Sequence, residues 1–166
     1  MNDLDWWSGR IRQAWRHARA RVEPDERDEL VAWLTVPQLA LFASMHRADQ
    51  RHGLDVVAHL RAEGHDDPEL LLAALLHDAA KGPGVSLAHR TAWSLSRRYG
   101  DRVLAACAPL PGFRSAFEVI RHHADASADL AREAGCPART VELIRHQDRP
   151  IDPVAGAALR LADEAS

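Results

Sequence analysis

Helix-forming residues run through this chain from one end to the other, and no segment shows the strict polar–apolar alternation of a half-buried strand. Ala, Leu, Arg and Glu predominate, and β-branched residues rarely cluster. Asp67-Pro68 and Asp152-Pro153 each place a helix N-cap before a proline in the first turn. Gly135 is expected to end the helix that precedes Cys136-Pro137. This pattern predicts an all-α fold.

The chain has 166 residues, which is the size of a single domain with a substantial core. We expect helices near residues 4–21, 25–34, 37–49, 52–63, 68–80, 86–99, 101–107, 113–134, 137–147 and 153–165. The first two would form an N-terminal helical extension, a hairpin within residues 1–36. The remaining helices would form a single-domain bundle over residues 37–166.

The expected N-terminal hairpin is rich in tryptophan. It holds four of the five tryptophans of the chain, namely Trp6, Trp7, Trp15 and Trp33. One interpretation is that the hairpin packs on the core of the bundle. The other is that it forms a homodimer surface, because exposed tryptophan is enriched at interfaces.

Composition and charge limit the classes of partner. The formal net charge is −3 and the pI is about 6.3, which argues against general nucleic-acid binding. The acidic start of the chain lacks the apolar stretch of a signal peptide, and the longest apolar run is about a third of a membrane span. Cys107 and Cys136 form no CxxC pair and suit a reducing compartment. We therefore expect a cytoplasmic protein without a membrane segment.

The segment from Leu70 to Lys81 carries the clearest chemical signal. Its apolar run ends in His77-Asp78, and Lys81 follows one helical turn later as the only lysine of the chain. Adjacent His and Asp at the end of a buried helix can bind one metal ion, the imidazole through nitrogen and the carboxylate through oxygen. Lys81 could then contact an anion held by that metal.

Two residues far away in the sequence can join this pair. His52 lies at the start of an amphipathic helix, and antiparallel packing of that helix would bring it to His77. Asp163 lies near the end of an apolar helix. A buried carboxylate there would need a metal or another cation as its partner.

This arrangement resembles the H…HD…D pattern of the HD-domain superfamily of metal-dependent phosphohydrolases. The matching segments are Gln50-Arg51-His52, Ala73–Lys81 and Leu161-Ala162-Asp163. The resemblance covers roughly residues 37 to 165. It implies an HD-type helical bundle in which one metal ion is bound by His52, His77, Asp78 and Asp163.

Two more segments are similar to HD proteins that bind two metals, such as the HD-type diadenosine tetraphosphate hydrolases. His123–Ala131 resembles their HxxxGA element, with Ser127 in place of glycine, and Leu143–Gln147 resembles their I-x-x-H element. The resemblance implies that His123 and His146 hold a second ion and that Asp78 bridges the two. The GYP signature of the HD-GYP phosphodiesterases is absent from the sequence, so we do not expect cyclic di-GMP cleavage.

His122 and His123 compete for the same role. His123 shares one helical stripe with Phe113, Ala116 and Ile120, whereas His122 points about 100° away from that stripe. We therefore choose His123 as the ligand.

The resemblance implies hydrolysis of a nucleotide or another small phosphate ester by a metal-activated hydroxide. Asp78 and Lys81 are the expected catalytic residues, because Asp78 binds the metal and Lys81 would hold a substrate phosphate. Further candidates for substrate binding are Arg51, Arg90 and Arg121. Mixed His and carboxylate ligands favour Fe or Mn, with Zn as an alternative, at one or two ions per chain.

Two other functions stay open. Some HD proteins use the same ligands to activate oxygen, so a di-iron oxygenase is one alternative. The other is a metal-stabilised regulatory or scaffold protein without turnover, which the tryptophan-rich N-terminal helices would suit. The complete ligand set and Lys81 speak against the scaffold, since a degenerate site usually loses some ligands.

Overall fold

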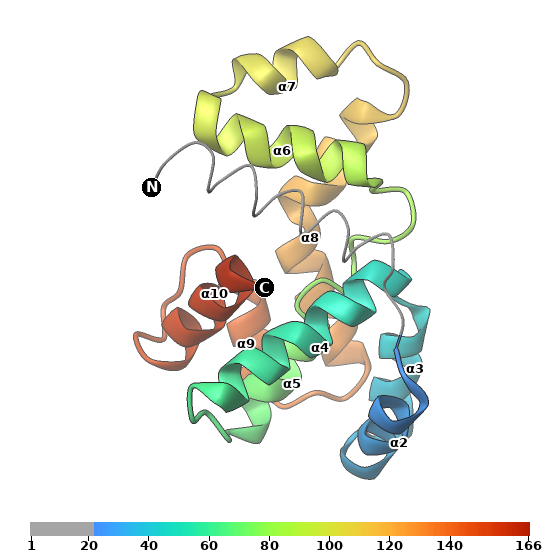
Figure 1. Cartoon of the computed structure of the whole chain (residues 1–166), viewed down its shortest axis with the longest axis vertical. Helices are drawn as coiled ribbons and strands as arrows, with labels where there is room; N and C mark the ends of the chain where they lie inside the picture. The colour runs from blue at the N-terminus through green and yellow to red at the C-terminus, as the bar shows by residue number, and fades with distance from the viewer. Residues whose placement is uncertain (1–21) are drawn as a thin grey trace.

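The computed structural model describes residues 22–166, and every regular element in that part of the chain is an α-helix. In chain order (Figure 1) the helices are α2 (Pro24–Trp33), α3 (Val36–Ser44), α4 (Arg47–Ala62), α5 (Pro68–Leu76), α6 (Leu87–Tyr99), α7 (Arg102–Cys107), α8 (Phe113–Glu133), α9 (Ala138–Arg145) and α10 (Ala155–Ala165). The predicted all-α fold is confirmed. Within residues 22–166, every helix is too short or too polar to span a bilayer.

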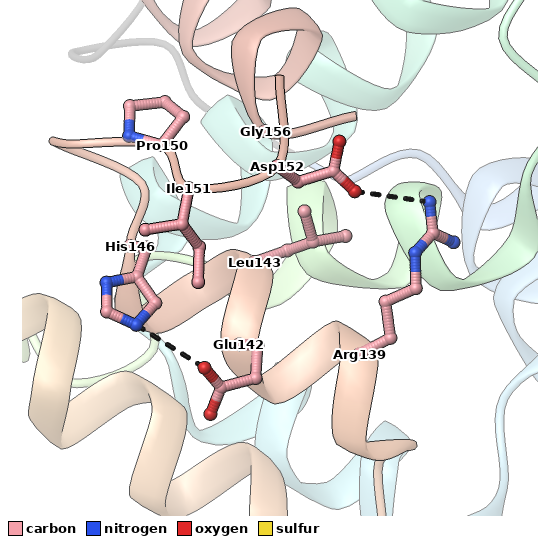
Figure 2. A pocket seen from close by; sticks show the side chains of 8 residues that line it. All are labelled: Arg139, Glu142, Leu143, His146, Pro150, Ile151, Asp152 and Gly156. Carbon is pink, nitrogen blue, oxygen red and sulfur yellow. Dashed lines mark ion pairs between the residues drawn. The ribbon is translucent and has the colours of Figure 1, made fainter. Parts of the chain in front are cut away.

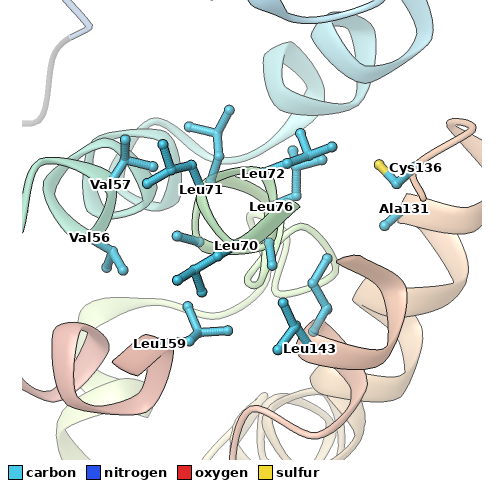
Figure 3. Packing of buried hydrophobic residues seen from close by; sticks show 14 of the residues in the cluster. Val56, Val57, Leu70, Leu71, Leu72, Leu76, Ala131, Cys136, Leu143 and Leu159 are labelled. Carbon is cyan, nitrogen blue, oxygen red and sulfur yellow. The ribbon is translucent and has the colours of Figure 1, made fainter. Parts of the chain in front are cut away.

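Helix α5 forms the centre of the main core. Its residues from Leu70 to Leu76 are all buried, because α4, α9 and α10 pack around it. Figure 3 shows Val57, Leu143 and Leu159 of these helices around α5. Burying one leucine side chain stabilises a fold by roughly 2 kcal/mol, so this run fixes the position of α5 and of the residues at its C-terminal end.

Helices α4 and α5 approach each other closely at Gly53. A Cβ atom at this position would lie 2.5 Å from the carbonyl oxygen of Leu75. A side chain of any size would therefore push the two helices apart. Because Gly53 follows His52 directly, this close contact places His52 beside the end of α5.

Helices α6 and α7 lie together beside the first half of α8 (Figure 1). A smaller hydrophobic cluster joins these helices, and its buried members are Val85, Ala92, Phe117 and Ile120. Helix α8 runs from this cluster to the main core, where Ala128 and Ala131 are buried. A single long helix thus connects the two clusters and carries His123 between them.

Two helix boundaries near the site differ from the prediction. Helix α3 ends at Ser44 and α4 begins at Arg47, because Nδ1 of His46 caps α4 by accepting a hydrogen bond from the Ala48 amide at 3.3 Å. His52 therefore lies in the second turn of α4 and not at a helix start. Helix α5 ends at Leu76 and not at residue 80, so the next residue is its C-cap.

The start of α10 also differs from the prediction. Asp152 is not the N-cap of this helix, since α10 begins at Ala155 and Val154 precedes it as N-cap. Oδ1 of Asp152 instead accepts hydrogen bonds from the backbone amides of Val154 and Ala155, at 2.9 and 2.8 Å. The corresponding prediction for Asp67 is confirmed, because its Oδ1 accepts a hydrogen bond from the Glu69 amide at 3.0 Å.

The first predicted helix, at residues 4–21, lies outside the described residues together with Trp6, Trp7 and Trp15. The second is present as α2, and its Leu30 is buried in the main core. Trp33 is partly buried and packs against the same core. Helix α2 therefore shares the main core with the helices that follow it.

Candidate metal centre

Four helices bring the predicted ligands together. His52 comes from α4, His77 and Asp78 from the end of α5, and Asp163 from α10. Among the described residues, one ligand atom each of His52, His77 and Asp163 lie within 4.8 Å of one another. His123, from α8, faces the same Asp78 oxygen as His77 does.

The distances between these atoms define a compact cluster. Nε2 of His52 is 2.7 Å from Oδ1 of Asp163, which is a hydrogen bond. Nε2 of His77 lies 3.4 Å from the same Asp163 oxygen and 3.5 Å from Oδ1 of Asp78. Nε2 of His123 lies 3.4 Å from that Asp78 oxygen. Asp78 and Asp163 thus each face two imidazole rings.

Backbone carbonyls fix which nitrogen of two rings carries the proton. Nδ1 of His77 donates a hydrogen bond to the Ala74 carbonyl at 2.8 Å, and Nδ1 of His123 donates one to the Ile120 carbonyl at 2.6 Å. A carbonyl can only accept, so Nδ1 bears the hydrogen in both rings. In the neutral form of each ring, Nε2 then turns a lone pair toward a carboxylate.

Two of these atoms are buried without a hydrogen-bond partner. They are Nε2 of His77 and Oδ1 of Asp78, and both side chains are only 1% exposed. A buried unpaired nitrogen and carboxylate oxygen that face each other need a proton or a metal ion between them. Two ligands of one tetrahedral metal ion, each about 2.1 Å from it, are separated by about 3.4 Å. The residues present therefore fit a metal ion.

The pKa values of the site point to the same need for positive charge. Burial has the largest effect on His77 and lowers its pKa, but the Asp78 and Asp163 carboxylates outweigh burial and raise the pKa to about 9. Burial raises the pKa of both carboxyl groups, yet their cationic neighbours hold these pKa values well below the usual range. Both carboxylates therefore stay ionised at neutral pH.

Lys81 lies on the other oxygen of Asp78. Its Nζ is 2.5 Å from Oδ2, and its side chain is 18% exposed while that of Asp78 is 1% exposed. The only lysine of the chain thus contacts the predicted ligands directly and leaves a partly exposed ammonium group at their edge.

Two residues that were not predicted to serve the site hold the turn after α5. The Ala80 amide donates a hydrogen bond to Oγ of Ser127 at 3.0 Å, and Nε2 of Gln147 donates one to the His77 carbonyl at 3.1 Å. Both side chains are buried. A polar residue on the buried face of an amphipathic helix is the sequence signal that could have revealed Ser127, which lies one turn after His123.

The structure places the three predicted arginines in ion pairs with carboxylates. Arg51 pairs with Glu26 of α2 and Asp55 of α4, at 2.7 and 2.9 Å. Arg121 is exposed and pairs with Glu118, one turn earlier on α8, at 3.0 Å. Arg90 pairs with Asp49, which is fully buried, at 2.6 Å. Each guanidinium therefore has an anionic partner within the protein.

Among the described residues, the contact of the His146 side chain is with Glu142 and not with the other predicted ligands. Its Nε2 is 3.4 Å from Oε2 of Glu142 on α9 (Figure 2). Both side chains line a surface cavity of about 120 Å³, together with Leu143, Pro150 and Ile151. The structure thus brings five of the six predicted metal ligands together and places His146 at this cavity.

The two adjacent histidines of α8 have different surroundings. His123 is buried and faces Asp78, whereas the His122 side chain is 65% exposed and lies 3.5 Å from Glu118. The predicted orientation of the helical stripe is therefore confirmed.

Comparisons of the chain with protein-family models, with curated proteins and with solved structures find no match.

Proposed function

We propose that this protein is a metal-dependent phosphohydrolase of the HD type that acts on a nucleotide or another small phosphate ester. The observation that carries the proposal is the pair of buried, unpartnered atoms, Nε2 of His77 and Oδ1 of Asp78, facing each other inside a cluster of ionised carboxylates. The H…HD…D sequence pattern, which the cluster joins in space, adds to it.

The residues that would hold the metal are His52, His77, Asp78 and Asp163. They offer two imidazole nitrogens and two carboxylate oxygens, a donor set that suits Fe or Mn and also accommodates Zn. The Nδ1 hydrogen bond of His77 to a backbone carbonyl orients that ring for coordination through Nε2.

A bound metal supplies a hydroxide at neutral pH and neutralises charge on a phosphoryl group. The protein's own residues supply orientation and further positive charge. Lys81 is held beside Asp78 with its ammonium partly open to solvent, where it would bind a phosphate oxygen of the substrate. His123 faces Asp78 through Nε2 and would orient that carboxylate or bind a second ion.

The number of ions rests on His123 and His146. The first of these faces Asp78, while the second pairs with Glu142 at the neighbouring cavity. The contacts of the described residues therefore give more direct support to the ion that His52, His77, Asp78 and Asp163 would hold. A second ion held by both His123 and His146 would require His146 to turn away from Glu142.

A di-iron or mononuclear iron oxygenase is the second candidate. The group formed by His52, His77 and Asp163 is a two-histidine, one-carboxylate set, which non-haem iron oxygenases also use. Lys81 favours the hydrolase, because an ammonium group at the metal site selects an anionic substrate.

Two further expectations are part of the proposal. Cys107 and Cys136 are both free, which supports a reducing, cytoplasmic location. A homodimer formed through the tryptophan-rich N-terminal residues also stays a proposal.

The test combines elemental analysis of the untagged protein with a phosphate-release screen across nucleotides. We expect Fe or Mn in the purified protein, with turnover on at least one phosphate ester. His77→Ala and Asp78→Ala should lose both metal and hydrolysis. His122→Ala, on the exposed side of α8, is the matched control and should keep both.

Each outcome separates the candidates. Full hydrolysis by purified Asp78→Ala protein would overturn the mechanism. Metal without phosphate release, together with oxygen consumption on an organic substrate, would favour the oxygenase. Absence of metal after reconstitution would refute the site itself.

A further inference from the structure

The turn that follows α5 carries three of the groups that meet at the site: His77, Asp78 and Lys81. It is a short, non-helical segment, because α5 ends at Leu76 and α6 begins only at Leu87. Two bonds of its own backbone shape it. The Ala79 amide donates to the Leu76 carbonyl, and the Lys81 amide donates to the Asp78 carbonyl, both at 3.0 Å.

Two other backbone groups of this turn are bound by side chains from outside it. The carbonyl of His77, the C-cap of α5, is among the last carbonyls of a helix, which have no partner within the helix. It accepts the hydrogen bond from Nε2 of Gln147, in a buried position just after α9. The Ala80 amide donates to Oγ of Ser127 on α8, whose side chain is fully buried.

Neither Ser127 nor Gln147 contacts a ligand atom in the described contacts, yet together they hold the metal-binding turn at both ends. Ser127 also lies four residues after His123, so the two share one face of α8. The bond from Ser127 to the turn therefore sets the position of Asp78 relative to His123, which is 3.4 Å away.

We propose that Ser127 and Gln147 are positioning residues that hold the His77–Lys81 turn in the arrangement that metal binding needs. The inference rests on the proposed function, since it assumes a metal at this site. Partners of this kind, which orient metal ligands without touching the metal, typically change metal affinity about 10–100-fold when they are removed.

The variants Ser127→Ala and Gln147→Met each remove one of these bonds and keep most of the side-chain volume. The matched control is Thr140→Val. Thr140 of α9 is also fully buried, and its Oγ1 donates a hydrogen bond to the Glu69 carbonyl at 3.0 Å, at the opposite end of α5. All three variants thus lose one side-chain hydrogen bond to the backbone, but the bond of Thr140 lies at the far end of α5 from the His77–Lys81 turn.

The experiment measures three quantities on the full-length protein: the Mn²⁺ dissociation constant, the visible absorption spectrum after loading with Co²⁺, and the midpoint of thermal unfolding without metal. We expect a similar fall of a few degrees in the midpoint for all three variants. Only Ser127→Ala and Gln147→Met should bind Mn²⁺ at least about tenfold more weakly and shift the Co²⁺ spectrum.

Two results would overturn this inference alone. One is that Ser127→Ala and Gln147→Met both keep the Mn²⁺ affinity and the Co²⁺ spectrum of the wild-type protein. The other is an equal loss of affinity in Thr140→Val, which would show general destabilisation and no effect of position. Absence of Mn²⁺ and Co²⁺ binding in the wild-type protein would overturn the proposed function and this inference together. Each site variant is judged separately, so one that fails to fold leaves the other as the test.

Discussion

The ion pair between Arg90 and Asp49 gives a prediction that separates a structural role from substrate binding. Arg90 lies on α6, at the smaller hydrophobic cluster, and Asp49 lies in the first turn of α4 beside the main core. Nη2 donates a hydrogen bond to Oδ2 at 2.9 Å, and Nη1 lies 2.6 Å from Oδ1. The pair therefore joins the two clusters of the protein.

The expected cost of breaking this pair follows from its burial. The Asp49 side chain is fully buried and that of Arg90 is 16% exposed. Removing one partner of a buried pair typically costs 3–5 kcal/mol, because the other charge is left without compensation, and the partial exposure of Arg90 suggests a value of about 3 kcal/mol. For a domain of this size, that loss lowers the unfolding midpoint by about 6–12 °C.

The assay is thermal and urea unfolding of Arg90→Leu, with Arg121→Leu as the control. The Arg121 pair with Glu118 is more than half exposed on both sides, so its loss should change stability by less than about 1 kcal/mol. The double variant Asp49→Leu/Arg90→Leu should recover part of the loss, because it removes both buried charges.

An unchanged unfolding midpoint in Arg90→Leu would refute this reasoning. If that variant also lost phosphate-ester binding, Arg90 would be a substrate ligand, in line with its place among the candidate substrate-binding residues. A double variant no more stable than Arg90→Leu would show that side-chain packing, and not the buried charge of Asp49, accounts for the loss.

Four further outcomes are expected. Mn²⁺ affinity should rise with pH up to about 9, because the metal must displace a proton from His77; affinity titrations at several pH values check this. The metal-free protein should lose stability as the pH rises through the His77 pKa of about 9, which unfolding at several pH values checks. Deleting the last four residues, which removes Asp163, should weaken metal binding by more than about tenfold in the same titration. Gly53→Ala should cost about 1–3 kcal/mol in urea unfolding, since its Cβ would meet the backbone of α5. His123→Ala should reduce hydrolysis, whereas the exposed His122→Ala should leave it unchanged in a side-by-side rate assay.

That His52, His77 and Asp163 lie close together could be predicted, because each lies in or directly after a helix whose apolar face must be buried. The unbroken apolar run of α5 requires burial on every side, so its C-terminal end must lie in the interior. Helical periodicity then selects which side chain of each neighbouring helix faces that end. The same reasoning correctly oriented His123 toward the interior.

The position of His146 could not be predicted in this way. Helix α9 ends at Arg145, and His146 is its C-cap with φ −104° and ψ 20°, outside helical geometry. Sequence spacing orients a side chain only while the backbone keeps a regular period. The Arg90–Asp49 pair could not be predicted either, because it joins residues of two different helices. In contrast, Glu118 lies one helical turn before Arg121, a spacing that the sequence does show.

The charge balance of the site bears on which substrate the proposed metal centre would accept. Asp78 and Asp163 contribute two negative charges, and Lys81 contributes one positive charge. In the metal-free protein a proton on His77 completes neutrality, since its pKa of about 9 keeps this ring charged at pH 7. A divalent metal would displace that proton, and these four groups together with the metal would then carry one net positive charge. The hydroxide of the proposed reaction would cancel that charge, but Lys81 at the edge of the site would still attract an anionic phosphate ester and not an uncharged substrate. This difference is the reason for proposing phosphate-ester hydrolysis over oxygen chemistry.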